Sequence, residues 1–318
     1  MNGDTAQRAW LTRSAAMASI AVALLLSGLK LWATWRTGST AMLGSLADTV
    51  LDLIASIATL AGVWIAARPA DEDHRFGHGK AESLSAIFQT VLIALSALGI
   101  LLRAIEQWVN GARTDAADEG IAVSIIAIAA TLVLLAWQRH VIRKTRSIAI
   151  STDHLHYKSD LLLNLAVIAA LVLDRYVGFG WADPLFAIAI AVCLGWGAWR
   201  ASGAAVDQIM DHEWPEEKRE ELLDVIAGRP DLRGVHDLRT RASGTRDFVQ
   251  FHAVVDPQMT VAHAHGVMDD LEARILAAFP DAEVLIHLDP DGRTAQGAAG
   301  SGSTPPPNLL AGRVQRSG

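Results

Sequence analysis

The chain has 318 residues, of which 51% are hydrophobic and 19% are charged, and its formal net charge is −7. This composition is too apolar for an average soluble protein. The acidic balance argues against a nucleic acid as a partner. All of the long apolar runs lie before residue 210. We therefore expect a membrane domain over residues 1–208 and an aqueous domain over residues 209–290.

Six apolar segments within residues 1–208 are long enough to cross a hydrocarbon core of ~30 Å, which requires ~20 helical residues. They are expected at about 14–35, 41–66, 82–108, 120–138, 149–174 and 182–206. Stretches rich in glycine, proline or charge separate them. The sequence thus predicts an α-helical membrane protein with six transmembrane helices.

The distribution of basic residues predicts how these helices are oriented. One side carries Arg8, Arg13, Arg68, Arg75, Lys80, Arg139, Arg143, Lys144 and Arg146, and the other carries Arg36, Arg113 and Arg175. Because the loops richer in Lys and Arg remain in the cytoplasm, the first side should be cytoplasmic. Both chain termini should then lie inside the cell.

The pattern of residues changes after Asp211. A helix is expected from Pro215 to about Gly228, followed by strands at 235–241 and 247–255, a helix at about 260–279 and a strand at 283–288. The order αββαβ predicts a small α+β domain with its helices on one face of the sheet. Residues 291–318 are rich in Gly, Ser, Thr and Pro and are expected to form a disordered tail.

Two pairs of ionisable residues interrupt the apolar segments. Asp48 and Asp52 lie in the second segment, and His156 and Asp160 lie in the fifth. Each pair is spaced i, i+4, so both members point to the same side of a helix. A charge near the bilayer centre costs at least ~2.5–3.5 kcal/mol, and three carboxylates with one imidazole suit tetrahedral Zn²⁺. The alternative is polar packing between helices, which generally uses Ser, Thr or Asn.

The stretch at 71–80 is a connecting loop dense in potential metal ligands. Asp71, His74 and His78 offer mixed carboxylate and imidazole contacts. Gly77 indicates a tight bend in the backbone. The alternative interpretation is a solvated loop in which acids balance bases.

The aqueous domain carries a group of histidines. Six of its residues can bind a metal ion through imidazole or carboxylate: His236, His252, His263, His265, His287 and Asp289. Any one histidine alone would be interpreted as an ordinary surface or core residue. Together with the ligand pattern upstream, they predict a second metal site.

These motifs resemble those of the cation diffusion facilitator family, and in particular of the bacterial ferrous-iron and zinc efflux pumps within it. The matching pieces are Asp48-x-x-x-Asp52, the sequence His156-Tyr157-Lys158-Ser159-Asp160 and the loop from Pro69 to Glu82. The resemblance extends over about residues 10–290.

The resemblance implies a homodimeric metal/proton antiporter of the bacterial inner (plasma) membrane, with a metallochaperone-like cytoplasmic domain. It also implies three sets of metal ligands. The transport site corresponds to Asp48, Asp52, His156 and Asp160, the loop site to Asp71, His74 and His78, and the cytoplasmic binuclear site to His236, His252, His265, His287 and Asp289. His154 and His263 are additional histidines that the resemblance does not assign.

We therefore expect a secondary transporter that exports Zn²⁺, with Fe²⁺, Cd²⁺ or Co²⁺ as alternatives, in exchange for protons. Its partners would be membrane lipid, a second copy of the chain, divalent metal ions and protons. Histidine and carboxylate ligands lose their protons to bind metal, so metal and protons compete. The alternatives are a divalent metal channel and a membrane metal sensor, neither coupled to protons. An enzyme is not expected, because the sequence lacks the His-Glu-x-x-His motif of a metallohydrolase.

Overall fold

The computed structural model describes residues 3–37, 40–110, 120–177, 182–227, 229, 231–244, 246–292 and 308–311. The side chain of Asp48 lies outside this described part, although its backbone belongs to a helix. The chain divides into two compact units, Met1–Asp207 and Gln208–Gly318. The two units are considered separately below.

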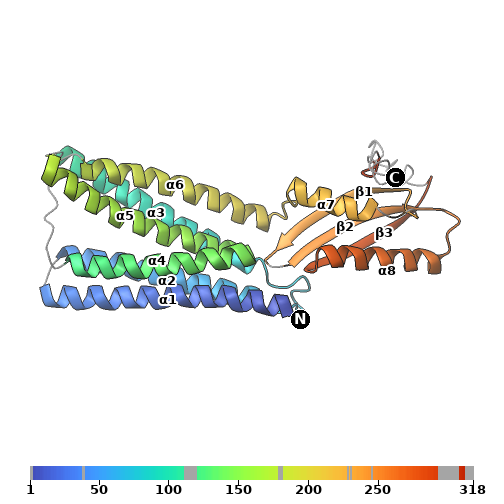
Figure 1. The fold of residues 1–318 in the computed structure, drawn as a ribbon, viewed down its shortest axis with the longest axis horizontal. Helices are drawn as coiled ribbons and strands as arrows, with labels where there is room; N and C mark the ends of the chain where they lie inside the picture. Colours follow the sequence, from blue (N-terminus) through green and yellow to red (C-terminus); the bar gives the residue numbers. More distant parts are fainter. Residues whose placement is uncertain are drawn as a thin grey trace. The chain divides into compact units, whose positions relative to one another are not determined.

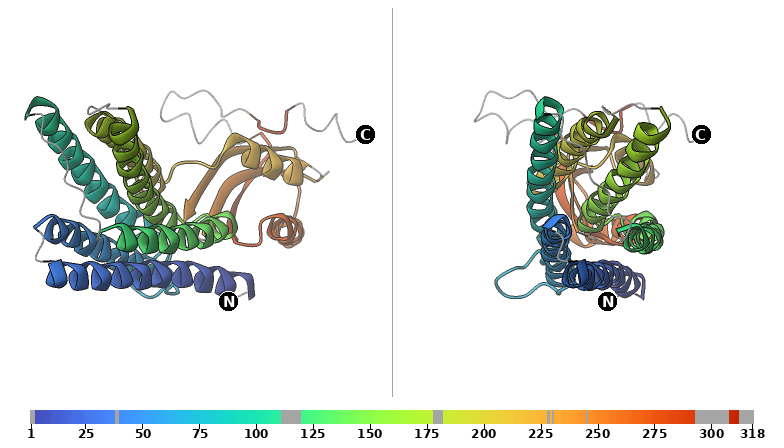
Figure 2. Two further views of the ribbon diagram at one scale, coloured as in Figure 1. Left: turned by 60° about the vertical axis from the view of Figure 1, so that its left-hand side comes forward. Right: turned by 90° about the vertical axis from the view of Figure 1, so that its left-hand side faces the viewer.

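The described residues of the first unit form six long helices (Figure 1): α1 (Gly3–Thr37), α2 (Thr40–Ala66), α3 (Ala81–Asn110), α4 (Gly120–Thr145), α5 (Ile148–Val177) and α6 (Ala182–Ile209). Helices α1 and α2 run side by side (Figure 2). Helix α5 packs against α2, α3 and α4. The two segments that carry the ionisable pairs, α2 and α5, are therefore neighbours.

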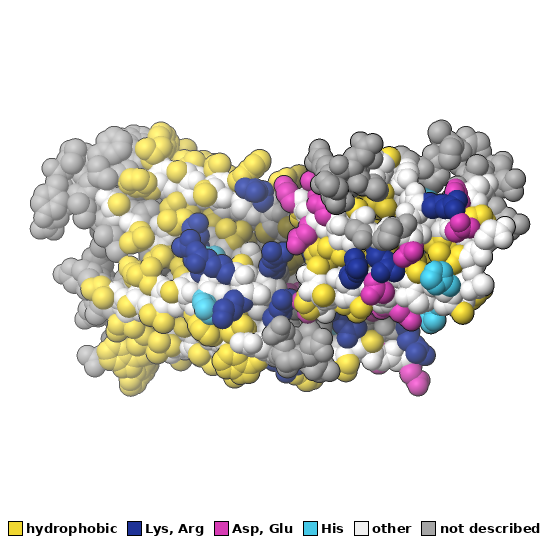
Figure 3. Space-filling view, turned by 45° about the vertical axis from the view of Figure 1, so that its right-hand side comes forward, with side chains coloured by type: hydrophobic (Ala, Val, Ile, Leu, Met, Phe, Trp, Pro, Cys, Tyr) yellow, Lys and Arg dark blue, Asp and Glu magenta, His cyan; other side chains and the backbone are white. Residues whose placement is uncertain are grey.

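Five of these helices are long and apolar enough to cross a membrane, judged on the described residues alone. The apolar stretches are Gln7–Trp32, Thr49–Ala66, Ala81–Val109, Ile125–Thr145 and Pro184–Ile209. Large hydrophobic side chains cover much of the surface of this unit (Figure 3). Helix α5 is not among the five, and its first half is rich in polar residues. The crossing that the sequence predicts at 149–174, the fifth of the six segments, therefore remains a prediction.

The second unit contains, in chain order, α7 (Glu216–Ala227), β1 (Gly234–Ser243), β2 (Arg246–Val255), α8 (Val261–Ala278) and β3 (Ala282–Pro290). The three strands form one sheet in the order β1-β2-β3. Strand β2 is antiparallel to β1 and parallel to β3. A parallel pair needs a long crossover connection, which α8 supplies.

Helices α7 and α8 share one hydrophobic core with the sheet. Phe251 and Ala253 of β2 are buried together with Leu222 of α7 and Leu271 of α8. Because successive side chains of a strand point to opposite faces, His252 belongs to the other face of the sheet. The helices thus cover one face and leave the histidine-bearing face free of them.

Four residues of the C-terminal tail, 308–311, pack against this unit. The Asn308 side chain accepts a hydrogen bond from the backbone N–H of Val235 in β1, and Leu310 is buried in the shared core. The composition of the tail did not predict this contact. The residues at 293–307 and 312–318 lie outside the described part of the chain.

Candidate metal centres

The first cluster of potential ligands lies between α2 and α5. Asp52, His156 and Asp160 each offer one ligand atom, and these atoms lie within 4.8 Å of one another. The Nε2 atom of His156 is 2.9 Å from Asp52 Oδ1 and 3.8 Å from Asp160 Oδ2. Asp48 lies one helical turn before Asp52, but the position of its side chain is outside the described residues.

The contact between His156 and Asp52 defines where a proton lies. The side chain of His156 is 8% exposed, and that of Asp52 is 20% exposed. A hydrogen bond between these two atoms requires one proton between them, carried either by the imidazole nitrogen or by the carboxylate oxygen. This proton must leave before both atoms can bind a metal ion.

A fully buried carboxylate, Asp153, supports α5 one turn before His156. It accepts hydrogen bonds from Ser19 Oγ of α1 at 2.5 Å, from Gln89 Nε2 of α3 at 3.0 Å and from Gln138 Nε2 of α4 at 2.8 Å. Four helices therefore meet at one side chain. Sequence analysis missed Asp153, although an acid within the apolar segment 149–174 is a signal that could have found it.

The neighbouring Tyr157 is a second anchor of the same turn. Its hydroxyl donates to the backbone oxygen of Ser19 at 3.0 Å and lies 2.9 Å from Ser56 Oγ of α2. The Tyr157 ring is 1% exposed and contacts the His156 ring edge-on, with 5.6 Å between the centroids. The turn of α5 that carries His156 is thus tied to both α1 and α2.

The second cluster is formed by Asp71, His74 and His78 in the loop between α2 and α3. Asp71 Oδ1 accepts from the backbone N–H of His74 at 2.6 Å, and Asp71 Oδ2 lies 3.2 Å from His78 Nε2. The left-handed backbone of Gly77, with φ of 80°, closes the turn. The backbone N–H of His74 is the main cause that holds the pKa of the Asp71 carboxyl below its ordinary value. All three ligand groups converge in a short loop.

The third cluster is assembled by the register of the sheet. His236 of β1 is paired with His252 of β2, and His252 is paired in turn with His287 of β3. Three histidines from distant parts of the sequence thus form one row across the sheet. Asp289 lies two residues after His287 and therefore on the same face of β3.

Asp289 joins this row of histidines. Its Oδ2 atom is 2.8 Å from His252 Nδ1 and 3.2 Å from His236 Nε2, and its Oδ1 atom is 3.5 Å from His287 Nε2. Within the described residues, neither ring nitrogen of the buried His236 makes a hydrogen bond. A buried nitrogen without a hydrogen-bond partner is expected at a ligand position, so this donor set fits a metal ion.

Two histidines of α8 do not join this row within the chain. The side chain of His265 is 78% exposed, and its Nδ1 atom lies 3.7 Å from Asp269 Oδ1. His263 is exposed, and its backbone N–H donates to the capping hydroxyl of Thr260. His265, which the resemblance places in the binuclear site, thus lies apart from the other four residues of that set.

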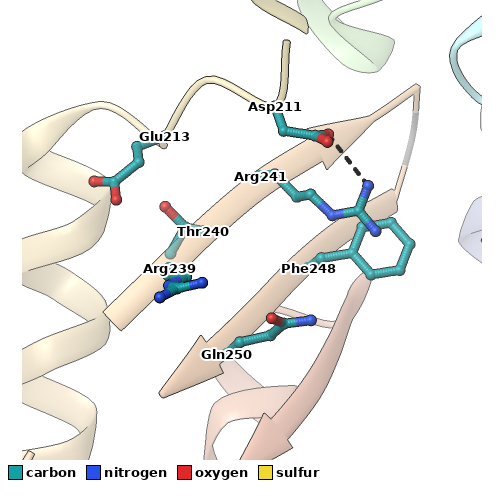
Figure 4. A pocket seen from close by; sticks show the side chains of 7 residues that line it. All are labelled: Asp211, Glu213, Arg239, Thr240, Arg241, Phe248 and Gln250. Carbon is teal, nitrogen blue, oxygen red and sulfur yellow. Dashed lines mark hydrogen bonds and ion pairs between the residues drawn. The ribbon is translucent and has the colours of Figure 1, made fainter. Parts of the chain in front are cut away.

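A pocket of about 240 Å³ lies elsewhere in the second unit (Figure 4). Its lining consists of Asp211, Glu213, Arg239, Thr240, Arg241, Phe248 and Gln250. Arg241 donates to Asp211 at 3.2 Å and lies over the ring of Phe248. None of the predicted metal ligands lines this pocket, so it is distinct from the three clusters.

The chain matches known proteins over most of its length. Residues 16–210 match the cation efflux transmembrane domain, and residues 214–291 match the cytoplasmic domain of cation efflux proteins. The cation-efflux pump FieF of Serratia proteamaculans is 42% identical over 294 residues, which are 92% of this chain and 98% of the relative. FieF of an Escherichia coli O127:H6 strain is 41% identical over 88% of this chain and 93% of the relative.

Solved structures that resemble this chain cover about a quarter of it. The metal-bound C-terminal domain of the CzcD transporter from Thermotoga maritima is 28% identical, covers 25% of this chain and 96% of that domain, and has a TM-score of 0.23. The identification rests on the sequence matches, which extend through both units. The chain belongs to the cation efflux family, also called the cation diffusion facilitators, whose members are multi-pass membrane transporters of divalent metal ions and not enzymes.

Proposed function

We propose that the protein is a proton-coupled antiporter that exports Zn²⁺ from the cytoplasm by alternating access, with Fe²⁺, Cd²⁺ and Co²⁺ as further candidate substrates. The observation that carries this function is the 2.9 Å hydrogen bond between His156 Nε2 and Asp52 Oδ1. The proton of this hydrogen bond would lie where a metal ion would bind, so the two would exclude each other. One site that holds either protons or metal couples the two flows.

The transport site consists of Asp48, Asp52, His156 and Asp160. Two helices supply these ligands, and Asp153 and Tyr157 hold one of the helices in place. Metal that enters from the cytoplasm displaces protons from the ligands. When the site opens outward, protons from outside displace the metal. Mixed nitrogen and oxygen ligation suits Zn²⁺ without excluding its neighbours in the first transition row.

The rest of the architecture follows the family. The protein would cross the bacterial inner membrane six times, with both termini in the cytoplasm, and would form a homodimer through its cytoplasmic domain. The match of residues 214–291 to the cytoplasmic domain of cation efflux proteins supports this domain assignment. The excess of Lys and Arg on one side of the helices supports the orientation.

The two remaining clusters would bind metal without carrying it across the membrane. Asp71, His74 and His78 form the loop site, and the row of histidines with Asp289 forms the cytoplasmic site. The ring nitrogens of His236 make no hydrogen bond among the described residues, and Nε2 lies 3.2 Å from Asp289 Oδ2, which supports a metal ion there. Metal that binds the folded domain and not the unfolded chain stabilises it by mass action. The cytoplasmic site would therefore sense the cytoplasmic metal concentration.

Zinc uptake into inverted membrane vesicles tests the antiport. An acidic lumen should accelerate Zn²⁺ uptake, and the lumen should become more alkaline as Zn²⁺ enters. Asp52→Asn should abolish both signals, whereas Asp207→Asn, the same change at an exposed acid of α6, should preserve them. A channel would pass Zn²⁺ without alkalinising the lumen. A sensor would pass no Zn²⁺, and deletion of the residues after 211 would abolish its function entirely.

A further inference from the structure

A short segment near the C-terminus contacts the edge of β1 that does not pair with β2. The Asn308 side chain accepts from the backbone N–H of Val235 at 3.1 Å and donates to the backbone oxygen of Arg233 at 3.3 Å. The backbone N–H of Leu309 donates to the Val235 oxygen at 2.8 Å. Residues 308–311 thus satisfy backbone groups of Arg233 and Val235 that an edge strand otherwise exposes.

Side-chain packing supports the same docking. Leu310 is 4% exposed and belongs to the hydrophobic core formed by α7, α8 and the sheet. A Cβ atom added to Gly234 would lie 2.8 Å from Asn308 Nδ2, closer than non-bonded atoms approach. Any larger residue at position 234 would therefore force the Asn308 side chain to shift.

The docked segment lies next to a proposed metal ligand. Val235, which exchanges hydrogen bonds with the segment, directly precedes His236. The pairing of β1 with β2 is interrupted after His236, and Asp237 there adopts a left-handed backbone with φ of 55°. Regular pairing with β2 thus extends from His236 toward the start of β1 only. The C-terminal segment contacts this same part of β1.

We propose that residues 308–311 form an intramolecular clip that docks on the β1 edge at Arg233–Val235 and positions His236 for metal binding. The clip lies beyond the residues that match either domain of the family, 16–210 and 214–291. Its effect on metal binding rests on the proposed cytoplasmic metal site, whereas its docking rests on the contacts with β1 alone.

Hydrogen–deuterium exchange of the full-length protein in detergent tests the docking. Loss of one ordinary hydrogen bond corresponds to roughly a fivefold change in an equilibrium. Asn308→Ala removes two such bonds and should therefore accelerate exchange at residues 233–236 by at least roughly fivefold. Gln258→Ala, at an exposed amide of the same unit, should leave exchange there unchanged. Unchanged exchange in Asn308→Ala would overturn the clip.

Gly234→Ala provides an independent variant, because its methyl group should displace Asn308 without truncating the tail. Both single variants remove the same contact, so the double variant Gly234→Ala/Asn308→Ala should exchange no faster than the faster single variant. Fully additive effects would contradict a shared contact. A synthetic peptide of residues 305–312 should restore protection to a chain that ends at residue 307, and failure to do so would count against docking at the edge.

Zinc titration of the same exchange experiment separates the docking from its role at the metal site. Zn²⁺ should protect the β1 and β2 peptides of the wild-type protein, and Asn308→Ala should raise the Zn²⁺ concentration needed by roughly fivefold. If Asn308→Ala exchanges faster than the wild type but needs the same Zn²⁺ concentration, the clip docks on β1 but does not position His236. Absence of Zn²⁺ protection in the wild type would refute the proposed metal site. The docking of the clip would then be decided by the exchange experiment without Zn²⁺.

Discussion

The membrane and cytoplasmic clusters bring similar ligands together by different means. In the membrane unit, one helical turn separates His156 from Asp160, and local helix geometry places both on one side of α5. In the cytoplasmic unit, His236, His252 and His287 come from three strands, and only the register of the sheet aligns them. Ligand spacing within one helix is thus visible in the sequence, whereas ligand rows across strands depend on the tertiary fold.

The two clusters also differ in how their surroundings hold them. Buried polar side chains from three other helices converge on Asp153, next to the membrane cluster. The cytoplasmic row lies on the face of the sheet that is free of helices, and its first strand is held at the edge by the C-terminal segment. We expect substitutions near the membrane cluster to have larger effects on transport and stability than substitutions in the cytoplasmic row, because water cannot readily replace a lost contact at a buried position.

The largest effect is expected from loss of a proposed metal ligand in the membrane unit. A residue that only orients a metal ligand is worth about 10- to 100-fold in metal affinity, so removal of a ligand should cost at least that much. Asp52→Asn and Asp160→Asn should therefore reduce Zn²⁺ transport to background in reconstituted vesicles. Each variant should still insert and elute as a folded protein. Wild-type flux in either variant would show that the carboxylates are structural.

The next effect concerns the choice of metal. Replacing His156 by Asp would give the site oxygen ligands alone, which suit harder ions such as Mn²⁺ better than an imidazole does. We expect the ratio of Mn²⁺ to Zn²⁺ transport to rise about tenfold, equivalent to about 1.4 kcal/mol of relative binding. Competition between the two ions in one vesicle preparation measures this ratio directly. An unchanged ratio would mean that the imidazole does not set selectivity.

The comparison also shows what the sequence could predict. The two ionisable pairs were found because a charge within an apolar helix is costly and helical spacing is local. The same cost applies to Asp153, which was overlooked; its role could not be predicted, because its donors, Ser19, Gln89 and Gln138, come from helices far away in the sequence. Hydrophobic periodicity describes one helix at a time and carries no information about which helices meet.

In the cytoplasmic unit, the sequence predicted the local elements but not the contacts between distant parts of the chain. The sequence predicted strands close to the observed β1, β2 and β3, because alternating apolar residues and turn signals are local. It grouped His265 with His287 through the resemblance, whereas the structure places His265 on an exposed face of α8. The docking of 308–311 was not predicted, because the tail was interpreted from its overall Gly, Ser and Pro content and not from the single segment Asn308-Leu309-Leu310.

A third prediction concerns the stability of the membrane unit. Asp153→Ala would remove three buried hydrogen bonds, each worth about 0.5–1.5 kcal/mol. The three donors keep other acceptors, namely Ala15 O, Thr59 Oγ1 and Ser19 Oγ. The melting temperature in detergent should fall at roughly 2–4 °C per kcal/mol for a unit of this size. Ser151→Ala, at an exposed position of the same helix, is the matched control. Equal melting of Asp153→Ala and the wild type would show that the buried hydrogen bonds contribute little.

A fourth prediction separates the histidines of the cytoplasmic unit. Metal at 100 times its dissociation constant stabilises a folded protein by about 2.7 kcal/mol. His252→Ala should remove most of the Zn²⁺-induced rise in melting temperature, because its ring contacts Asp289 at 2.8 Å. His265→Ala, at a 78% exposed side chain, should have a smaller effect. Equal losses would indicate that His265 joins the ligands in the assembled protein.

The smallest effect is expected at the loop between α2 and α3, which we propose lies outside the transport path. Since Asp71 has a pKa below its ordinary value near ~3.9, the contacts of its carboxylate are fully present above that value and are lost as the pH falls through the lowered pKa. Asp71 therefore stays ionised throughout the pH range of transport assays. A pH dependence of metal binding within that range would therefore not come from Asp71.

Asp71→Asn should consequently weaken Zn²⁺ protection of residues 67–80 in hydrogen exchange by the same factor at about pH 6 and about pH 8. Transport should change by less than about twofold, the scale of a surface substitution away from the path. Asp73→Asn, an exposed acid of the same loop, is the matched control and should leave Zn²⁺ protection unchanged. A loss of protection confined to one pH would mean that Asp71 titrates within this range, and a transport defect as large as that of Asp52→Asn would place the loop cluster on the transport path.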